Sequence, residues 1–158
     1  MSLSYSTLHT YLPYTKVIYK MSEISQNAER VKNYNLRKSA VEILTAAPTE
    51  DHLWGCIVAF QHYPFRTITG LPFSYTLKIG RNGKYTRELF IDHRENSKSL
   101  AWSSVRMAFE KAAEMEGAVL MRSKEMADVR GVSYSFSLLW RFGLITVAEG
   151  VEKKLKGK

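Results

Sequence analysis

Apolar side chains recur at the spacing of an α-helix in two long stretches of the chain. The first stretch predicts a helix over Ser22–Ala47, because its second half carries an apolar residue at nearly every helical turn. These positions are Leu36, Ala40, Ile43, Leu44 and Ala47. Pro48 follows directly and is expected to end the helix, since its ring has no N–H and clashes with the preceding turn.

The second helical stretch is predicted over Ser99–Glu116, where four apolar residues share one face and Gly117 is placed to end the helix. The residues of this face are Trp102, Val105, Phe109 and Ala112. Residues 131–143 fit either a strand or a helix, and the segment LLWRFG favours the helix. A short strand is expected at Ala118–Met121. The segment LITV, which follows residue 143, fits either a closing strand or an apolar anchor.

A short, continuous apolar run, WGCIVAFQ at Trp54–Gln61, is typical of a buried strand, because it is rich in β-branched and aromatic residues. Strict alternation then predicts a hairpin, with Phe73–Ile79 as the outgoing strand and Tyr85–Ile91 as the return. A three-residue turn, Arg81 to Gly83, keeps the apolar side chains on one face. This register pairs residues 79 with 85, 75 with 89 and 73 with 91.

These elements predict an α+β fold, in which a small antiparallel sheet of three strands packs against helices and a C-terminal helical segment completes the core. The length of 158 residues suits one domain. We expect an N-terminal extension or arm at residues 1–20, a single α+β domain at 21–149 and a basic tail at 150–158. The tyrosine-rich first twenty residues are compatible with an irregular arm or an edge strand.

The chain is basic, with 23 Lys and Arg against 15 Asp and Glu, a formal net charge of +8. Such a balance attracts polyanions, and the attraction weakens as salt is added. No stretch approaches the roughly 18 apolar residues that would span a bilayer. The first twenty residues contain no apolar core of a signal peptide, so we expect a cytoplasmic protein without a membrane partner.

The sequence offers little catalytic chemistry. No phosphate-binding glycine motif occurs, the four histidines lack metal-ligand spacing, and the single Cys56 lies in an apolar run. The best acid–base cluster is Asp92, His93 and Glu95, which also suits a solvated polar loop. We therefore expect no catalytic residues, no metal and no cofactor, and a binding protein rather than an enzyme.

Basic side chains gather on the predicted hairpin and on the loop and helix that follow it. We predict that these residues contact a DNA or RNA backbone: Lys78, Arg81, Lys84, Arg87, Arg94, Lys98 and Arg106. Hydroxyls at Ser97, Ser99 and Ser103 lie near the expected start of the second helix, where free backbone N–H groups can meet a phosphate.

The predicted order of helix, three strands and helix over Asn33–Glu116 resembles the double-stranded-RNA-binding domain and covers about half of the chain. In that family a Ser-Lys-rich turn before the second helix touches phosphates, and Ser97-Lys98-Ser99 occupies the comparable place. The lysine run of the family is absent, since Leu100 to Trp102 follow instead. Because topology alone does not carry function, the resemblance implies at most a shared architecture.

The sequence thus predicts a non-catalytic nucleic-acid-binding or regulatory protein. The alternative is a protein–protein interaction module, dimeric and without a nucleic-acid role. In that case aromatic residues outside the periodic faces would form the contact surface, namely Tyr5, Tyr11, Tyr63, Phe65 and Trp140.

Overall fold

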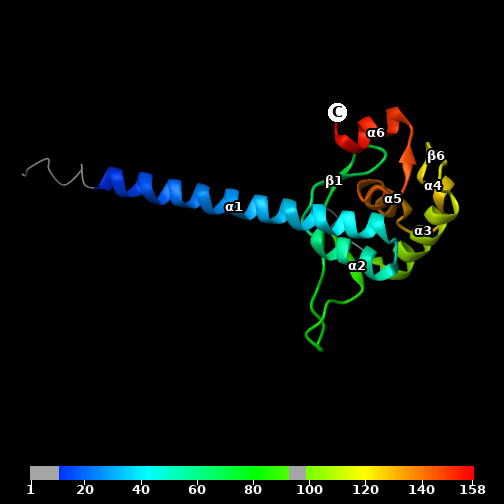
Figure 1. The fold of residues 1–158 in the computed structure, drawn as a ribbon, viewed down its shortest axis with the longest axis horizontal. Coiled ribbons are helices and arrows are strands. Elements are labelled where there is room, and N and C mark those ends of the chain that lie inside the picture. Colours follow the sequence, from blue (N-terminus) through cyan, green and yellow to red (C-terminus); the bar gives the residue numbers. More distant parts are fainter. Residues whose placement is uncertain (1–10, 93–98) are drawn as a thin grey trace, which may run out of the picture. The chain divides into compact units, whose positions relative to one another are not determined.

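The computed structural model describes residues 11–92 and 99–158 of the chain (Figure 1). The chain divides into two compact units, Met1–Lys38 and Ser39–Lys158. Helix α1, Tyr11–Ala46, begins in the first unit and ends in the second. The predicted helix over 22–47 is confirmed, and it begins eleven residues earlier, so residues 11–20 form helical turns rather than an irregular arm or edge strand.

The second unit contains five further helices and seven short strands within the described residues. The helices are α2 (Glu50–Ala59), α3 (Trp102–Glu114), α4 (Ser123–Met126), α5 (Val132–Arg141) and α6 (Glu149–Lys156). The strands are β1 (Phe65–Arg66), β2 (Pro72–Phe73), β3 (Tyr75–Thr76), β4 (Glu88–Ile91), β5 (Leu100–Ala101), β6 (Val119–Leu120) and β7 (Thr146–Val147).

The fold is α+β, as the sequence predicts. The antiparallel sheet of three strands has the order β3-β4-β5, and two further pairs form, β1 with β2 and β6 with β7. Helices α2, α3 and α5 supply most of the apolar side chains that cover these strands. No helix in the described part of the chain has the length and apolar character that crossing a bilayer requires.

The strand predicted at 54–61 is wrong, because residues 54–59 belong to helix α2 and the last two residues form the turn after it. The side chain of Thr49 accepts a hydrogen bond from the backbone N–H of His52 at 3.2 Å, which caps the helix at its N-terminus. Glu50 and Asp51 then lie in the first turn, where carboxylates stabilise the helix dipole. A helix buried among apolar residues shows the same continuous apolar run as a buried strand, so the capping residues distinguish the two.

The predicted hairpin forms, with Ile79 paired to Tyr85 as expected. Its far end is wrong by two residues, since Tyr75 pairs with Ile91 rather than Leu89. A bulge accounts for the shift. Between the pairs Thr76–Phe90 and Ile79–Tyr85, the outgoing strand has two residues and the return strand has four. Within this segment the N–H of Leu77 donates to the Gln61 side chain, 3.0 Å away. The predicted pairing of Phe73 with Ile91 is also wrong, because Phe73 pairs with Phe65 in the neighbouring hairpin.

The second predicted helix is confirmed but begins at Trp102 rather than Ser99. Leu100 and Ala101 instead form β5, the third strand of the sheet, paired with Leu89 and Glu88. The sheet therefore has three strands, as expected, but its third strand is not the one at 54–61 on which the resemblance to the double-stranded-RNA-binding domain depended.

The C-terminal third follows the sequence closely. Residues 131–143 form a helix, and the strands β6 and β7 pair in parallel, where a short strand and either a strand or an apolar anchor were expected. Gly131 and Gly143 adopt positive φ angles of 74° and 77° on either side of α5. Residues 150–158, the expected basic tail, lie largely within α6, and its Leu155 is buried.

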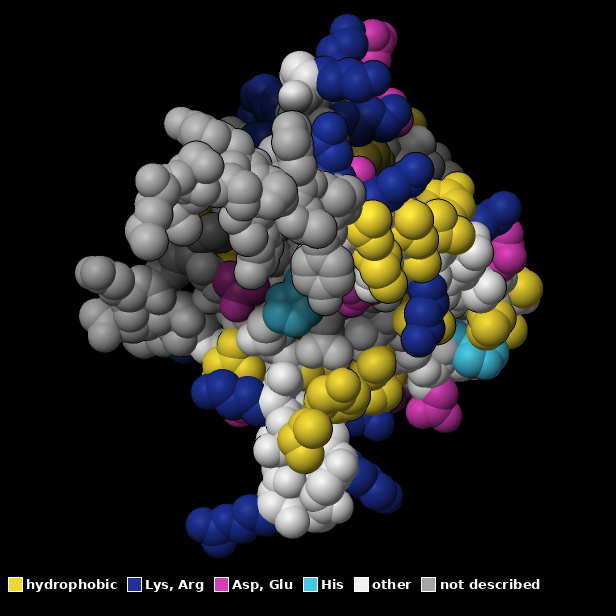
Figure 2. Space-filling model, turned by 90° about the vertical axis from the view of Figure 1, so that its left-hand side faces the viewer, with side chains coloured by type: hydrophobic (Ala, Val, Ile, Leu, Met, Phe, Trp, Pro, Cys, Tyr) yellow, Lys and Arg dark blue, Asp and Glu magenta, His cyan; other side chains and the backbone are white. Residues whose placement is uncertain are grey.

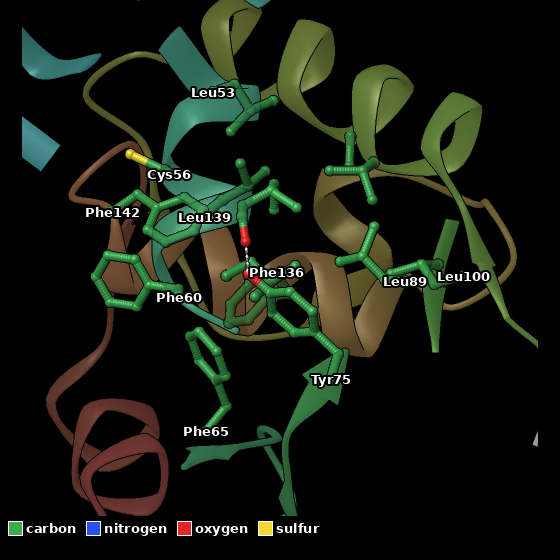
Figure 3. Packing of buried hydrophobic residues seen from close by; sticks show 14 of the residues in the cluster. Leu53, Cys56, Phe60, Phe65, Tyr75, Leu89, Leu100, Phe136, Leu139 and Phe142 are labelled. Atoms are coloured by element: carbon green, nitrogen blue, oxygen red, sulfur yellow. Dashed lines mark hydrogen bonds between the residues drawn. The ribbon is translucent and has the colours of Figure 1, made fainter. Parts of the chain in front are cut away.

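The core of the second unit is rich in aromatic side chains (Figure 3). Phe60 makes ring contacts with Phe65 and Phe142, and Phe65 stacks on Tyr75 at a centroid distance of 5.9 Å. The Tyr75 hydroxyl donates a hydrogen bond to the carbonyl oxygen of Ile57, 2.7 Å away, in the last turn of α2. This bond joins the start of the hairpin to the helix across the core and satisfies a carbonyl that has no partner within the helix.

Candidate nucleic-acid interface

The hairpin between β3 and β4 projects from the rest of the second unit as its lowest part in Figures 1 and 2. Asn82-Gly83 lies at its turn, and Gly83 adopts the positive φ of 74° that the turn requires. The N–H of Gly80 donates to the carbonyl of Lys84 at 2.7 Å, and the Asn82 side chain accepts from the N–H of Lys84 at 3.1 Å. These bonds hold the turn in one conformation.

Four of the predicted contact residues lie on this hairpin, and all four are exposed: Lys78, Arg81, Lys84 and Arg87. They occur within ten residues that contain no carboxylate. None of them forms an ion pair with another residue of the described chain. In Figure 2, Lys and Arg side chains extend to both sides near the end of the projection. The structure therefore brings four cationic groups together without neutralising them.

Aromatic rings support the two cationic groups nearest the base of the hairpin. The Lys78 ammonium lies 3.9 Å from the centroid of the Phe90 ring. The Arg87 guanidinium lies 4.4 Å from the ring of Trp54 and 5.3 Å from that of Trp102. A cation held over a ring is attracted by the electrons of the ring and keeps its full charge, unlike a cation paired with a carboxylate.

The two indoles under Arg87 are themselves fixed. Trp54 meets Trp102 edge to face with ring centroids 5.0 Å apart. The indole N–H of Trp102 donates to a carboxylate oxygen of Glu50 at 2.8 Å, and the backbone N–H of Trp102 donates to the carbonyl of Arg87 at 3.1 Å. The base of the hairpin is thus tied to α2 and α3, so the position of Arg87 is determined by the core.

The tip of the hairpin also carries an apolar pair. The alternation along the hairpin indicates that Ile79 and Tyr85 continue the buried face, but their side chains are 69% and 40% exposed. The hairpin extends beyond the core at these positions, so the pair lies in solvent between the basic residues. Exposed apolar side chains on a β-ribbon are one means by which proteins contact bases in a groove.

The remaining predicted contact residues do not join the hairpin surface. Arg94 and Lys98 lie outside the described residues, as do Ser97 and the pair His93 and Glu95. Arg106 lies on α3 and is exposed, but its side chain approaches Glu110 one turn away, with Nε and Oε1 3.8 Å apart. This exposed pair partly offsets its charge.

The predicted phosphate site at the start of the second helix is not formed as expected. Because α3 begins at Trp102, Ser99 precedes a strand rather than the first helical turn. The first N–H of the helix, that of Trp102, already donates to Arg87. No side chain caps this helix. Ser103 is exposed in the first turn and remains a prediction as a phosphate contact.

Only Asp92 of the predicted acid–base cluster lies within the described residues. The Asp92 carboxylate accepts a hydrogen bond from the Ser74 hydroxyl at 2.8 Å, a bond that links the two ends of the hairpin strands. Residues 11–92 and 99–158 hold no group of three His, Cys, Asp or Glu side chains arranged for a metal ion. Burial raises the pKa of the Cys56 thiol to about 12, so the reactive thiolate is not formed near neutral pH.

A second basic surface lines a pocket of about 450 Å³ beside β1, α5 and α6. Its cationic residues are Arg66, Arg141 and Lys156. All three are engaged within the protein. Nη1 of Arg66 donates to the carbonyl of Gly70 at 3.1 Å, Nε of Arg141 donates to the Tyr63 hydroxyl at 2.9 Å, and Lys156 pairs with Glu152 at 2.6 Å. The hairpin is therefore the surface with more uncommitted positive charge.

Of the five aromatic residues of the alternative prediction, Tyr5 and the side chain of Tyr11 lie outside the described part of the chain. Phe65 is only 3% exposed and belongs to the core, while Tyr63 and Trp140 are half-buried. Tyr63 packs edge to face against Phe60 at 5.2 Å and accepts the hydrogen bond from Arg141. These rings thus serve mainly to build the second unit.

Sequence reasoning missed the two indoles beneath Arg87, because the contact joins three segments far apart in the sequence. Trp54 lies in the middle of α2 and Trp102 begins α3, and nothing in the sequence around either indole indicates that Arg87 is its partner. Searches against protein-family models, curated proteins and solved structures found no match to this chain.

Proposed function

We propose that the protein binds nucleic acid through the hairpin between β3 and β4, with the phosphate backbone as the principal contact. The observation that carries the proposal is the group of four exposed, un-neutralised cationic side chains within ten residues of one projecting ribbon. A two-stranded ribbon fits the grooves of a duplex, and Lys and Arg on its edges can reach the phosphates on both sides.

The cations at the base of the hairpin and those at its turn differ in their surroundings. Arg87 and Lys78 are held over aromatic rings at the base, whereas Arg81 and Lys84 flank the turn. Because most protein–nucleic acid hydrogen bonds go to phosphate and sugar, such a surface would bind with little dependence on sequence. The exposed pair of Ile79 and Tyr85 lies where a ribbon would meet base edges or a groove floor.

The test is a titration of the full chain against duplex DNA, duplex RNA and single strands by fluorescence anisotropy at several salt concentrations. Neutralising about four phosphates gives a slope of log K against log salt of about −3.6 for duplex DNA. Between 50 and 200 mM salt the affinity should then fall by about 100-fold. The relative affinities of the three ligands identify the preferred nucleic acid.

The variant Arg81→Glu with Lys84→Glu should weaken binding across all sequences and reduce the slope by about two units. A matched control is Arg122→Glu with Lys124→Glu, which changes the net charge equally on exposed residues at α4. The control should retain the slope of the wild type. Equal losses in both variants would mean that net charge alone drives binding, and binding that is absent or insensitive to salt would refute the proposal.

A further inference from the structure

The first unit carries an apolar stripe with the repeat of a coiled coil. From Val17 to Val31, apolar residues follow one another at spacings of four, three, four and three. The members of this stripe are Val17, Met21, Ile24, Ala28 and Val31. A period of 3.5 residues differs from the wider apolar face that a helix presents to a globular core, and it is the pattern of helices that wind around one another.

The structure leaves this stripe in water. Val17 is 54% exposed, Met21 64%, Ile24 60% and Val31 60%. In the first unit, none of the side chains from Thr15 to Lys38 is buried. Without a partner, a helix of this length in water depends on its own weak propensity, since most helical stability in proteins comes from packing an apolar face.

We propose that this stripe, continued to Asn35, pairs with the same stripe of a second copy of the chain in a parallel two-stranded coiled coil. In heptad notation Met21, Ala28 and Asn35 occupy a positions, and Val17, Ile24 and Val31 occupy d positions. The β-branched d residues alone favour three or four strands. An Asn at a single a position favours two parallel strands in register, because the two amides then meet in one layer and satisfy each other.

The charges flanking the stripe are compatible with this pairing. In a parallel pair, each g residue faces the e residue five positions later in the other helix. Lys20 then faces Ser25, and Lys32 faces Asn27, so no like charges oppose each other along the seam. The proposal is independent of the hairpin and stands whether or not the hairpin binds nucleic acid.

A cysteine placed in the stripe tests both the partner and the register. In the variant Ala28→Cys, a parallel pair in register brings the two new thiols into the same layer, within reach of a disulfide. In a glutathione redox buffer, a covalent dimer should form on a non-reducing gel. The control Gln26→Cys places the thiol at an f position, away from the seam, and should remain monomeric on the gel. The native Cys56 is buried and does not interfere.

Light scattering after gel filtration measures the assembly itself. The wild type should have a mass of about 36 kDa, twice the 18.1 kDa of one chain. The variant Ile24→Lys with Val31→Lys should be a monomer. Its matched control, Gln26→Lys with Asn33→Lys, adds the same charges at the same spacing on f positions and should remain a dimer.

Each other result overturns the proposal. A monomeric wild type at 100 µM, or a dimer that persists in the Ile24→Lys and Val31→Lys variant, would exclude the stripe as the contact. A mass of three or four chains would refute the two-stranded arrangement. A dimer in which Ala28→Cys forms no disulfide would refute the parallel register.

Discussion

The hydrogen bond between Tyr75 and Ile57 provides a test of how the hairpin is joined to the core. The variant Tyr75→Phe removes only the hydroxyl and keeps the ring, which stacks on Phe65 with an angle of 20° between the planes. The Tyr75 side chain is fully buried, and its hydroxyl donates to the Ile57 carbonyl at 2.7 Å. The change therefore leaves a buried carbonyl at the end of α2 without this donor.

The size of the effect follows from the acceptor that is left behind. Removing one partner of a buried hydrogen bond costs about 1–3 kcal/mol, because the other partner loses its hydrogen bond without gaining one to water. We expect Tyr75→Phe to lower the free energy of unfolding by about 2 kcal/mol. For a unit of this size that corresponds to a fall in Tm of roughly 6–10 °C.

The assay is thermal and urea unfolding followed by circular dichroism. The matched control is Tyr85→Phe, because the Tyr85 side chain is 40% exposed and lies at the hairpin tip. A hydroxyl lost there should change the free energy of unfolding by no more than about 0.5 kcal/mol. If the two variants lower Tm equally, or if Tyr75→Phe lowers it by less than about 1 °C, the reasoning is refuted.

Three further predictions follow from single positions. Gly131→Ala should lower stability by more than Gly83→Ala. Both glycines have a φ of 74°, but of the two only Gly131 would place an added Cβ against another side chain, that of Leu100, 2.5 Å away. Equal urea midpoints for the two variants would contradict this. Ser135→Ala should leave stability unchanged or raise it, since the buried Ser135 hydroxyl has no partner in the described structure. Ser137→Ala should instead lower stability by about 1 kcal/mol, because it removes the hydrogen bond that the Ser137 hydroxyl donates to the carbonyl of Ser133. Burial raises the pKa of the Cys56 thiol from 9.0 to about 12. Between pH 9 and 12 only the unfolded chain loses this proton, so the free energy of unfolding should decline as pH rises through that range. In chemical denaturation the variant Cys56→Ala should show a shallower decline.

The elements that the sequence predicted best are those with a periodic face and a clear stop. In α3, Trp102, Val105 and Ala112 are buried as their spacing indicates, and Gly117 has a φ of 81° just after the helix. The segment containing α5 was resolved in favour of the helix for a related reason: Phe136, Leu139 and the terminating glycine follow helical spacing. Local pattern is sufficient where it determines both the face and the end of an element.

The errors arose where tertiary contacts override local pattern. The run at 54–61 is apolar on all sides because α2 is packed on several sides, which removes the period that separates helix from strand. The hairpin register shifts at a bulge, where Gln61 takes the N–H of Leu77, an interaction sixteen residues apart. Helix α3 begins three residues after the predicted start, because Leu100 and Ala101 pair with β4 as a strand. None of these partners can be recognised from alternation alone.

For the candidate site, the sequence pattern was enough to identify the basic hairpin but not the aromatic rings that lie against its cations. Turns lie on the protein surface, so charged residues near a tight turn are exposed. The alternation and the Asn-Gly turn were therefore enough to predict that these cations face solvent. The contact of Arg87 with two indoles depends on the packing of α2 against α3, which the mistaken strand at 54–61 excluded. An error in one element thus concealed the partner of a residue in another.

The proposed function depends on where the positive charges of the second unit lie more than on the net charge. On the described helices, Lys111, Lys153 and Lys156 each have a carboxylate within 2.9 Å, three or four residues away, and such exposed pairs reduce the local field. The hairpin from Lys78 to Arg87 contains no carboxylate that could offset its cations in this way. Aromatic rings replace the carboxylates beneath Lys78 and Arg87, so these cations are oriented without being neutralised. The hairpin therefore presents four exposed cations that form no ion pair with the described residues, and the proposed function rests on this local charge rather than on the total.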